Sequence, residues 1–128
     1  MKIEHIAIWT EDLERSREFY SVFFGAKSGE KYINSAKGFS SYFLSFKSGC
    51  RLEIMKMESR SDSEITEENF KGISHFAISV GSKQTVDELT ESLRENGFTI
   101  ASNPRETGDG YYESVVLDPD GNRVEITV

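Results

Sequence analysis

The chain has 128 residues, of which 37% are hydrophobic and 29% are charged, and its formal net charge is −7. This composition is that of an ordinary soluble globular protein, and the acidic balance argues against nucleic acid as a partner, because phosphates attract a basic face. The single cysteine, Cys50, has no partner for an internal disulfide, and no segment approaches about 18 uninterrupted apolar residues. We therefore expect a cytoplasmic protein without a signal peptide or a membrane span.

The first half of the chain predicts a strand, a helix and three further strands. Apolar and polar residues alternate from Ile3 to Trp9, which is the pattern of a half-buried strand. A helix follows, since Thr10 or Asp12 can cap its first turn and Gly25 supplies the backbone freedom that ends it. The apolar face of this helix consists of Leu13, Phe19, Tyr20, Phe23 and Phe24. The strand-like runs after it cover residues 31–33, 42–46 and 51–57.

The second half predicts the same order of elements. Ser82 or Thr85 can cap its helix, and Asn96 with Gly97 closes it. The apolar stripe of this helix consists of Val86, Leu89 and Leu93. The strand-like runs cover residues 99–101, 112–117 and 123–128.

Two connecting segments have a clear character. In the turn DPDG, Asp118 suits the first position, Pro119 presets the backbone angle of the second, and Gly121 suits the last. This turn predicts a hairpin between the last two strands. The polar segment 57–72 is the expected connector between the halves, with a helical turn near residues 63–70.

Histidine and glutamate recur at matching places in the two halves. His5 and His75 stand in the similar segments EHIAIW and SHFAIS, 70 residues apart. Glu53 and Glu125 stand in LEI and VEI, 72 residues apart. This similarity indicates a tandem duplication of a unit of about 60 residues. The sequence therefore predicts an α+β domain over residues 1–128 made of two βαβββ units, at about 1–60 and 70–128.

The four repeated residues favour a metal site. Each histidine lies on the strand face opposite its apolar neighbours, and so does each glutamate. If the two units pair pseudo-symmetrically, the four side chains converge, and two imidazoles with two carboxylates suit a divalent transition metal. A lone strand histidine is more often structural, and a lone mid-strand glutamate usually faces solvent. The match between His5, Glu53, His75 and Glu125 favours the metal site over these readings.

The chain resembles the glyoxalase I / bleomycin-resistance / extradiol-dioxygenase group, or vicinal oxygen chelate superfamily. The similar motifs are EHIAIWTEDLERSREFY, FFGA, LEIM, GISHFAISV and LDPDGNRVEI. The resemblance implies two βαβββ units that form a curved mixed sheet around a metal-bearing cup. It is strongest to the lactoylglutathione lyases, in which all four metal positions are filled. By this resemblance His5, Glu53, His75 and Glu125 bind nickel, zinc or a similar ion at the interface of a homodimer, His5 and Glu53 coming from one subunit.

The resemblance also implies a reaction. Glyoxalase I converts the hemithioacetal of methylglyoxal and a thiol, through an enediolate, into a lactoyl thioester. Glu125 would be the main catalytic base, and Glu53 a metal ligand and second base. Two family positions differ here: Trp9 replaces an arginine that pairs with a glutathione carboxylate, and Met57 replaces an asparagine. Both argue against glutathione as the thiol, and the cations that remain for a substrate carboxylate are Arg51, Lys71, Arg105 and Arg123.

Other functions stay open at this point. A thiol transferase of the fosfomycin-resistance type normally leaves the fourth metal position to substrate, so Glu53 argues against it. An epimerase of an acyl thioester would use similar proton abstraction, whereas extradiol dioxygenases need a further histidine. A non-enzymatic drug- or metabolite-binding protein of the bleomycin-resistance type would use an acidic cleft between two subunits and no complete metal set. A purely structural protein leaves the matched histidines and glutamates unexplained.

Overall fold

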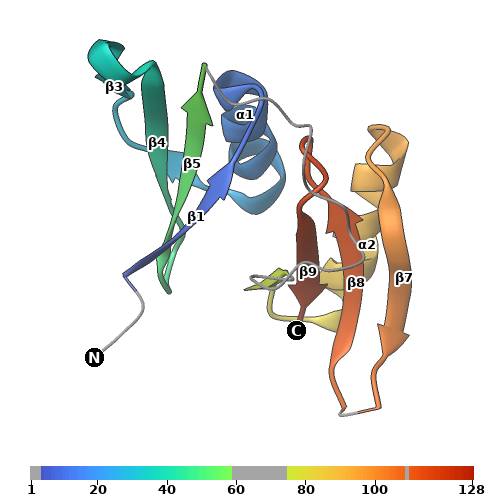
Figure 1. Ribbon diagram of the computed structural model, residues 1–128. Helices are drawn as coiled ribbons and strands as arrows, with labels where there is room; N and C mark the ends of the chain where they lie inside the picture. Colours follow the sequence, from blue (N-terminus) through green and yellow to red (C-terminus); the bar gives the residue numbers. More distant parts are fainter. Residues whose placement is uncertain (1–3, 59–74, 109) are drawn as a thin grey trace. The chain divides into compact units, whose positions relative to one another are not determined.

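The computed structural model describes residues 4–58, 75–108 and 110–128. The chain divides into two compact units, Met1–Phe70 and Lys71–Val128, and in the described part of each an α-helix packs on a mixed sheet (Figure 1). The predicted α+β fold of two tandem βαβββ units is confirmed. That the two units form a single domain stays a prediction. Among the described residues, no helix combines the length and the apolar character that crossing a bilayer requires.

The first unit orders its strands so that its first and last strands are neighbours. The sheet order is β1-β5-β4-β2, with β3 paired to β4, and β1 runs parallel to β5 while the other pairs are antiparallel. The elements are β1 His5–Trp9, α1 Leu13–Phe24, β2 Lys27–Ser28, β3 Tyr32–Asn34, the 3-10 helix η1 Ser35–Lys37, β4 Phe39–Ser45 and β5 Arg51–Met57. Strand β2 is additional to the three predicted strands.

Helix α1 begins and ends at residues that the sequence singled out. The Asp12 carboxylate accepts hydrogen bonds from the backbone N–H groups of Glu14 (3.0 Å) and Arg15 (3.1 Å), so Asp12 is the N-cap. Thr10, the other predicted cap, instead lies 2.6 Å from the Ser16 hydroxyl in the interior. Gly25 ends the helix with φ of 65°. The buried side of α1 consists of Leu13, Ser16, Phe19 and Tyr20.

The second unit repeats the arrangement. Its sheet order is β6-β9-β8-β7, with β6 parallel to β9 and the other pairs antiparallel. Ser82 caps α2 by accepting from the Thr85 backbone N–H at 3.1 Å, and Asn96 is the C-cap. The elements are β6 Phe76–Ser79, α2 Lys83–Glu95, β7 Ile100–Glu106, β8 Tyr112–Leu117 and β9 Arg123–Thr127.

The turn between β8 and β9 is held by one buried carboxylate. Asp118 is 4% exposed, and its Oδ1 accepts from the backbone N–H groups of Asp120 (2.9 Å) and Asn122 (2.8 Å). Gly121 has φ of 83°, and its N–H donates to the Asp118 carbonyl at 3.0 Å. This is the predicted hairpin turn. It sets the register in which Val115 stands opposite Glu125.

Each unit has its own apolar core between helix and sheet. Along β9, Val124 and Ile126 are fully buried, and Glu125 between them points to the other face of the sheet. The fully or nearly fully buried apolar side chains of the first unit are Leu13, Phe19, Tyr20, Leu44, Leu52 and Ile54, and those of the second are Val86, Leu93, Val116, Val124 and Ile126. Val115 is also buried, but it lies on the sheet face of its register partner Glu125. The predicted connector over 57–72 lies mostly outside the described residues.

Candidate functional site

In the first unit the structure brings His5 together with Glu53. His5 opens β1, Glu53 lies in the middle of the adjacent parallel strand β5, and Ala7 is the register partner of Glu53. Because side chains alternate along a strand, the His5 and Glu53 side chains share one face of the sheet. His5 Nε2 lies 3.9 Å from Glu53 Oε2, with side chains 40% and 15% exposed. The half-buried carboxylate thus faces an accessible imidazole.

In the second unit the structure brings His75 together with Glu125 in the same way. His75 directly precedes β6, and Ala77 is the register partner of Glu125 on the adjacent parallel strand β9. His75 Nε2 lies 3.4 Å from Glu125 Oε2, with side chains 45% and 20% exposed. The two units therefore present the same His–Glu pair from the same two strands. Convergence of the two pairs on one ion stays a prediction.

The two pairs offer donor atoms of the right type for a divalent ion. Two ligands that each lie about 2.1 Å from an ion are about 3.0 to 3.5 Å apart. The His75–Glu125 separation falls in this range, and the His5–Glu53 separation is slightly longer. Imidazole nitrogen and carboxylate oxygen suit nickel, zinc and similar metals. Among the described residues, no group of three or more His, Cys, Asp or Glu side chains is placed to hold an ion, so one pair alone would be an incomplete site.

Glu4, which the sequence did not indicate as part of the site, contacts His5. Glu4 Oε2 lies 2.5 Å from His5 Nδ1, and Glu4 Oε1 accepts from Nε of Arg51 at 2.8 Å and also from its Nη2. These bonds, that of His5 first, hold the pKa of the Glu4 carboxyl below its ordinary value. The contact between Glu4 and His5 is hard to predict from the sequence, because neighbouring residues of a strand normally point to opposite faces.

The face that carries Glu53 becomes apolar toward the far end of β1. Trp9 is the register partner of Met55, and its ring packs edge-on against Phe39 at 6.4 Å between centroids. Met57 is the register partner of Phe39 on the same face. The two departures from the glyoxalase I pattern, Trp9 and Met57, thus lie on the face of Glu53.

Two of the four cations considered for a substrate carboxylate already contact carboxylates of the chain. Arg51 binds Glu4, and Nη1 of Arg105 lies 3.5 Å from Glu113 Oε1. Lys71 lies outside the described residues. Arg123 is exposed at the start of β9.

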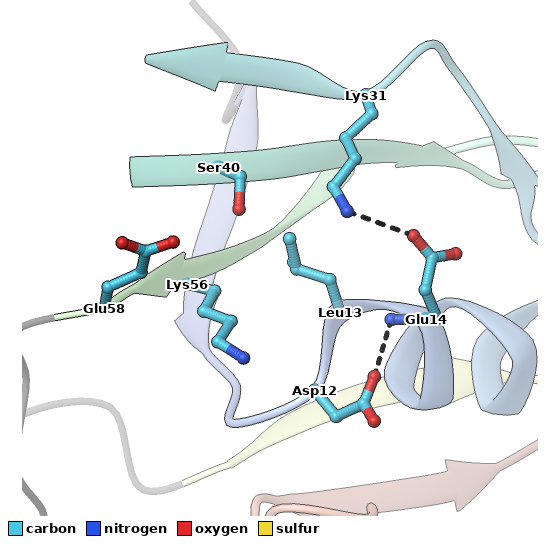
Figure 2. Close-up of a pocket in the computed structure, with 7 residues that line it drawn as sticks. All are labelled: Asp12, Leu13, Glu14, Lys31, Ser40, Lys56 and Glu58. Carbon is cyan, nitrogen blue, oxygen red and sulfur yellow. Dashed lines mark hydrogen bonds and ion pairs between the residues drawn. The ribbon is translucent and has the colours of Figure 1, made fainter. Parts of the chain in front are cut away.

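A separate cavity of about 320 Å³ lies at the N-terminus of α1 (Figure 2). Its register pair Ser40 and Lys56 lies on the sheet face opposite Glu53, so this cavity is not part of the His–Glu face. Lys31 Nζ lies 3.2 Å from Glu14 Oε1 across it. The residues that line it are Asp12, Leu13, Glu14, Lys31, Ser40, Lys56 and Glu58.

Comparison with known families agrees with this architecture. Residues 2–126 match the model of the Glyoxalase/Bleomycin resistance protein/Dioxygenase superfamily. The chain belongs to this superfamily. The resemblance inferred from the sequence motifs is therefore confirmed, and with it membership of a superfamily that includes glyoxalase I lyases.

Individual relatives include both named enzymes and a protein of unassigned role. The chain is 28% identical over 131 residues to the uncharacterized protein YqjT of Bacillus subtilis, covering 97% of this chain and 96% of that protein. It is 32% identical over 126 residues to lactoylglutathione lyase GLX1 of Arabidopsis thaliana, covering 95% of this chain and 42% of that enzyme. The chain thus spans less than half the length of the plant lyase.

Solved structures show the same fold. The trypanothione-dependent glyoxalase I of Leishmania major superposes with a TM-score of 0.77 at 26% identity, over 99% of this chain and 86% of that one. Glyoxalase I of Zea mays superposes with a TM-score of 0.77 at 22% identity, over 98% of this chain and 44% of that one.

Proposed function

We propose that this chain is a metal-dependent, glyoxalase I-like lyase, which isomerises the hemithioacetal of a 2-oxoaldehyde and a thiol to a 2-hydroxyacyl thioester. The observation that carries the proposal is the repeated His–Glu pair, with Nε2–Oε2 separations of 3.9 and 3.4 Å in the two units. One such pair is an ordinary polar contact. Two pairs from corresponding strands supply the four donors of a glyoxalase I metal site, in which His5, Glu53, His75 and Glu125 bind one nickel or zinc ion.

The proposed reaction moves one proton between neighbouring carbons. The proton leaves a carbon next to a carbonyl, which produces an enediolate, and then returns to the adjacent carbon. When bound, the divalent ion supplies a Lewis acid that stabilises the negative charge of the oxygens. Glu125 accepts the proton and delivers it to the second carbon, with Glu53 as the second base. His5 and His75 contribute nitrogen donors and no proton.

The proposed thiol is not glutathione. Trp9 and Met57 lie on the face of Glu53, and both are apolar where a glutathione-binding site needs a cation and an amide. Arg51 does not replace the missing cation, because it is engaged with Glu4. The Leishmania relative is trypanothione-dependent, which supports a search among several thiols.

The proposal includes a cytoplasmic homodimer. In it, His5 and Glu53 of one subunit join His75 and Glu125 of the other, or all four come from one chain. A reducing cytoplasm suits Cys50, which carries no disulfide.

A second candidate function is non-enzymatic binding of a drug or metabolite. It is favoured by the aromatic side chains at one end of the first sheet, where Trp9 is 36% and Tyr32 is 55% exposed, and by the net charge of −7. Such a protein requires no metal, so metal dependence separates it from the lyase. A thiol transferase or epimerase would share the metal, and substrate assays separate those.

The deciding experiment is a calorimetric titration of untagged, chelator-stripped protein with Ni²⁺ and with Zn²⁺. We expect one ion for every two His–Glu pairs, which is one ion per chain. We expect His75→Ala to lose this binding. The matched control is Glu106→Gln, an exposed carboxylate that pairs with Lys83. Hemithioacetal isomerisation by the loaded protein is then measured with several thiols. Absence of site-specific binding would exclude the lyase and favour the binding protein.

A further inference from the structure

The imidazole of His5 is part of a closed ring of contacts between four side chains. Glu4 Oε2 lies 2.5 Å from His5 Nδ1, and Arg51 donates from Nε to Glu4 Oε1 at 2.8 Å. The Arg51 guanidinium lies 4.1 Å from the centroid of the Phe43 ring. Phe43 in turn packs edge-on against His5, at 5.3 Å between centroids. Each member of the ring thus contacts two others.

The first contact determines which imidazole nitrogen carries the proton. An ionised carboxylate accepts hydrogen bonds and donates none, so His5 Nδ1 must donate to Glu4. A neutral imidazole has a single N–H, which leaves the lone pair on Nε2. Nε2 is the atom that faces Glu53 Oε2 at 3.9 Å. Two acceptor atoms therefore face each other, which is the arrangement that a cation stabilises.

Arg51 explains why Glu4 adopts this position. Residues next to each other at the start of a strand normally turn to opposite faces, so Glu4 would be expected to turn away from His5. The two N–H groups of Arg51 hold Glu4 Oε1, and the Arg51 backbone N–H donates to the Glu4 carbonyl at 3.0 Å. Cation–π contact with Phe43 fixes the guanidinium. Arg51 therefore holds Glu4 both at its carboxylate and at its backbone carbonyl.

We propose that Glu4, held by Arg51, is the positioning residue of His5: it keeps the proton on Nδ1 and turns Nε2 toward Glu53 as a metal donor. Metal ligation by Nε2 rests on the proposed function, whereas the proton position does not. Histidine ligands generally donate their second N–H to such a partner, and its loss weakens metal binding about 10- to 100-fold. The residue before His75 in the sequence is Ser74, which has no carboxylate, so the neighbouring residue cannot supply the same contact to His75.

The test is the tautomer of His5, read from long-range ¹H–¹⁵N correlation spectra of metal-free protein at about pH 8.5, where ordinary imidazoles are neutral. The chain has two histidines, so a His75→Asn variant assigns the signals. We expect the Nδ1–H form in the wild type and a shift toward Nε2–H in Glu4→Leu. Arg51→Met, which removes the guanidinium that holds Glu4, gives an intermediate mixture. The matched control is Glu30→Leu, at an exposed position, and it leaves the spectrum unchanged.

Ni²⁺ titration of the same variants separates the inference from the proposed function. We expect the affinity to fall about 10- to 100-fold in Glu4→Leu and to stay unchanged in Glu30→Leu. An Nδ1–H wild type that binds no Ni²⁺ supports the positioning of His5 and overturns the metal site. A wild type with the Nε2–H form, or a Glu4→Leu variant with the wild-type tautomer and Ni²⁺ affinity, overturns the role of Glu4. The wild-type spectrum alone decides the tautomer if Glu4→Leu does not fold.

Discussion

His75 Nε2 lies 3.4 Å from Glu125 Oε2, across two adjacent parallel strands. The same two atoms of His5 and Glu53 are 3.9 Å apart in the first unit. The duplication has therefore preserved a side-chain pair as well as a backbone. In both units the carboxylate is less exposed than the imidazole.

The first prediction concerns the proposed base. Glu125→Gln removes the proton acceptor but keeps an oxygen donor of similar shape. We expect kcat for hemithioacetal isomerisation to fall by about 10²- to 10⁴-fold, with a smaller effect on Ni²⁺ affinity. Steady-state kinetics and calorimetry on the Ni²⁺-loaded protein measure the two effects, and Glu106→Gln is the control. Near-normal turnover in Glu125→Gln would remove Glu125 from this role.

The second prediction concerns the thiol. Trp9→Arg places a guanidinium on the face of Glu53, where a substrate carboxylate can bind it. We expect kcat/KM for the glutathione hemithioacetal to rise about tenfold relative to that for an uncharged thiol. The control is Val22→Arg, which adds the same charge at a position that is 66% exposed on α1. Equal ratios in the two variants would show that Trp9 does not select the thiol.

The third prediction concerns a buried pair of hydroxyl groups in the second unit. Thr90 Oγ1 donates to the Val86 carbonyl at 2.6 Å and lies 2.7 Å from Ser114 Oγ, so Ser114 is the donor between them. Thr90→Val keeps the shape but leaves the fully buried Ser114 hydroxyl without this acceptor. We expect the free energy of unfolding to fall by about 1–3 kcal/mol.

The double variant completes this test. Ser114→Ala in the Thr90→Val background removes the orphaned hydroxyl, so we expect part of the lost stability to return. Urea unfolding of the wild type, both single variants and the double variant gives the coupling. Simple additivity of the two substitutions would mean that the hydroxyl contact contributes nothing.

The fourth prediction concerns pH. The Tyr42 hydroxyl donates to Glu14 at 2.8 Å and Lys31 lies 3.2 Å away, and these contacts lower the pKa of the Glu14 carboxyl from its ordinary value of 4.5. A lowered pKa means that the contacts stabilise the folded state fully above that value, and that this contribution is lost as the pH falls through the lower folded value.

Thermal unfolding of Glu14→Gln checks this sign. We expect the variant to have a lower Tm than the wild type at pH 7, and the difference to shrink as the pH falls from about 5 to 3. Glu30→Gln, at an exposed position, provides the control. A Tm difference that is the same at both pH values would show that the charge of Glu14 is not responsible.

Much of the fold was predictable because its signals are local. Asp12, Gly25 and Asp118 each act within a few residues of their own position, and each has the role that its residue type indicates. Alternation in β9 likewise predicts that Val124 is buried and that Glu125 points the other way. Residue propensities and the spacing of apolar residues along the chain carry this information without any knowledge of distant neighbours.

The remainder depends on contacts between distant residues. Strand β2 has only two residues, Lys27–Ser28, and exists through its pairing with β4. Strand β4 begins at Phe39, before the apolar run, because Phe39 pairs with Met57. Glu4 joins His5 through Arg51, which is 47 residues away. No local pattern in the sequence indicates these pairings.

The turn at Asp118 limits how the chain can be re-engineered. Its carboxylate ties down the backbone of the turn and so sets how β8 and β9 align. A shift of one residue in that alignment would exchange the two faces of β9, placing Glu125 under α2 and Val124 on the other side. Peptide insertions or circular permutation should therefore avoid the DPDG hairpin.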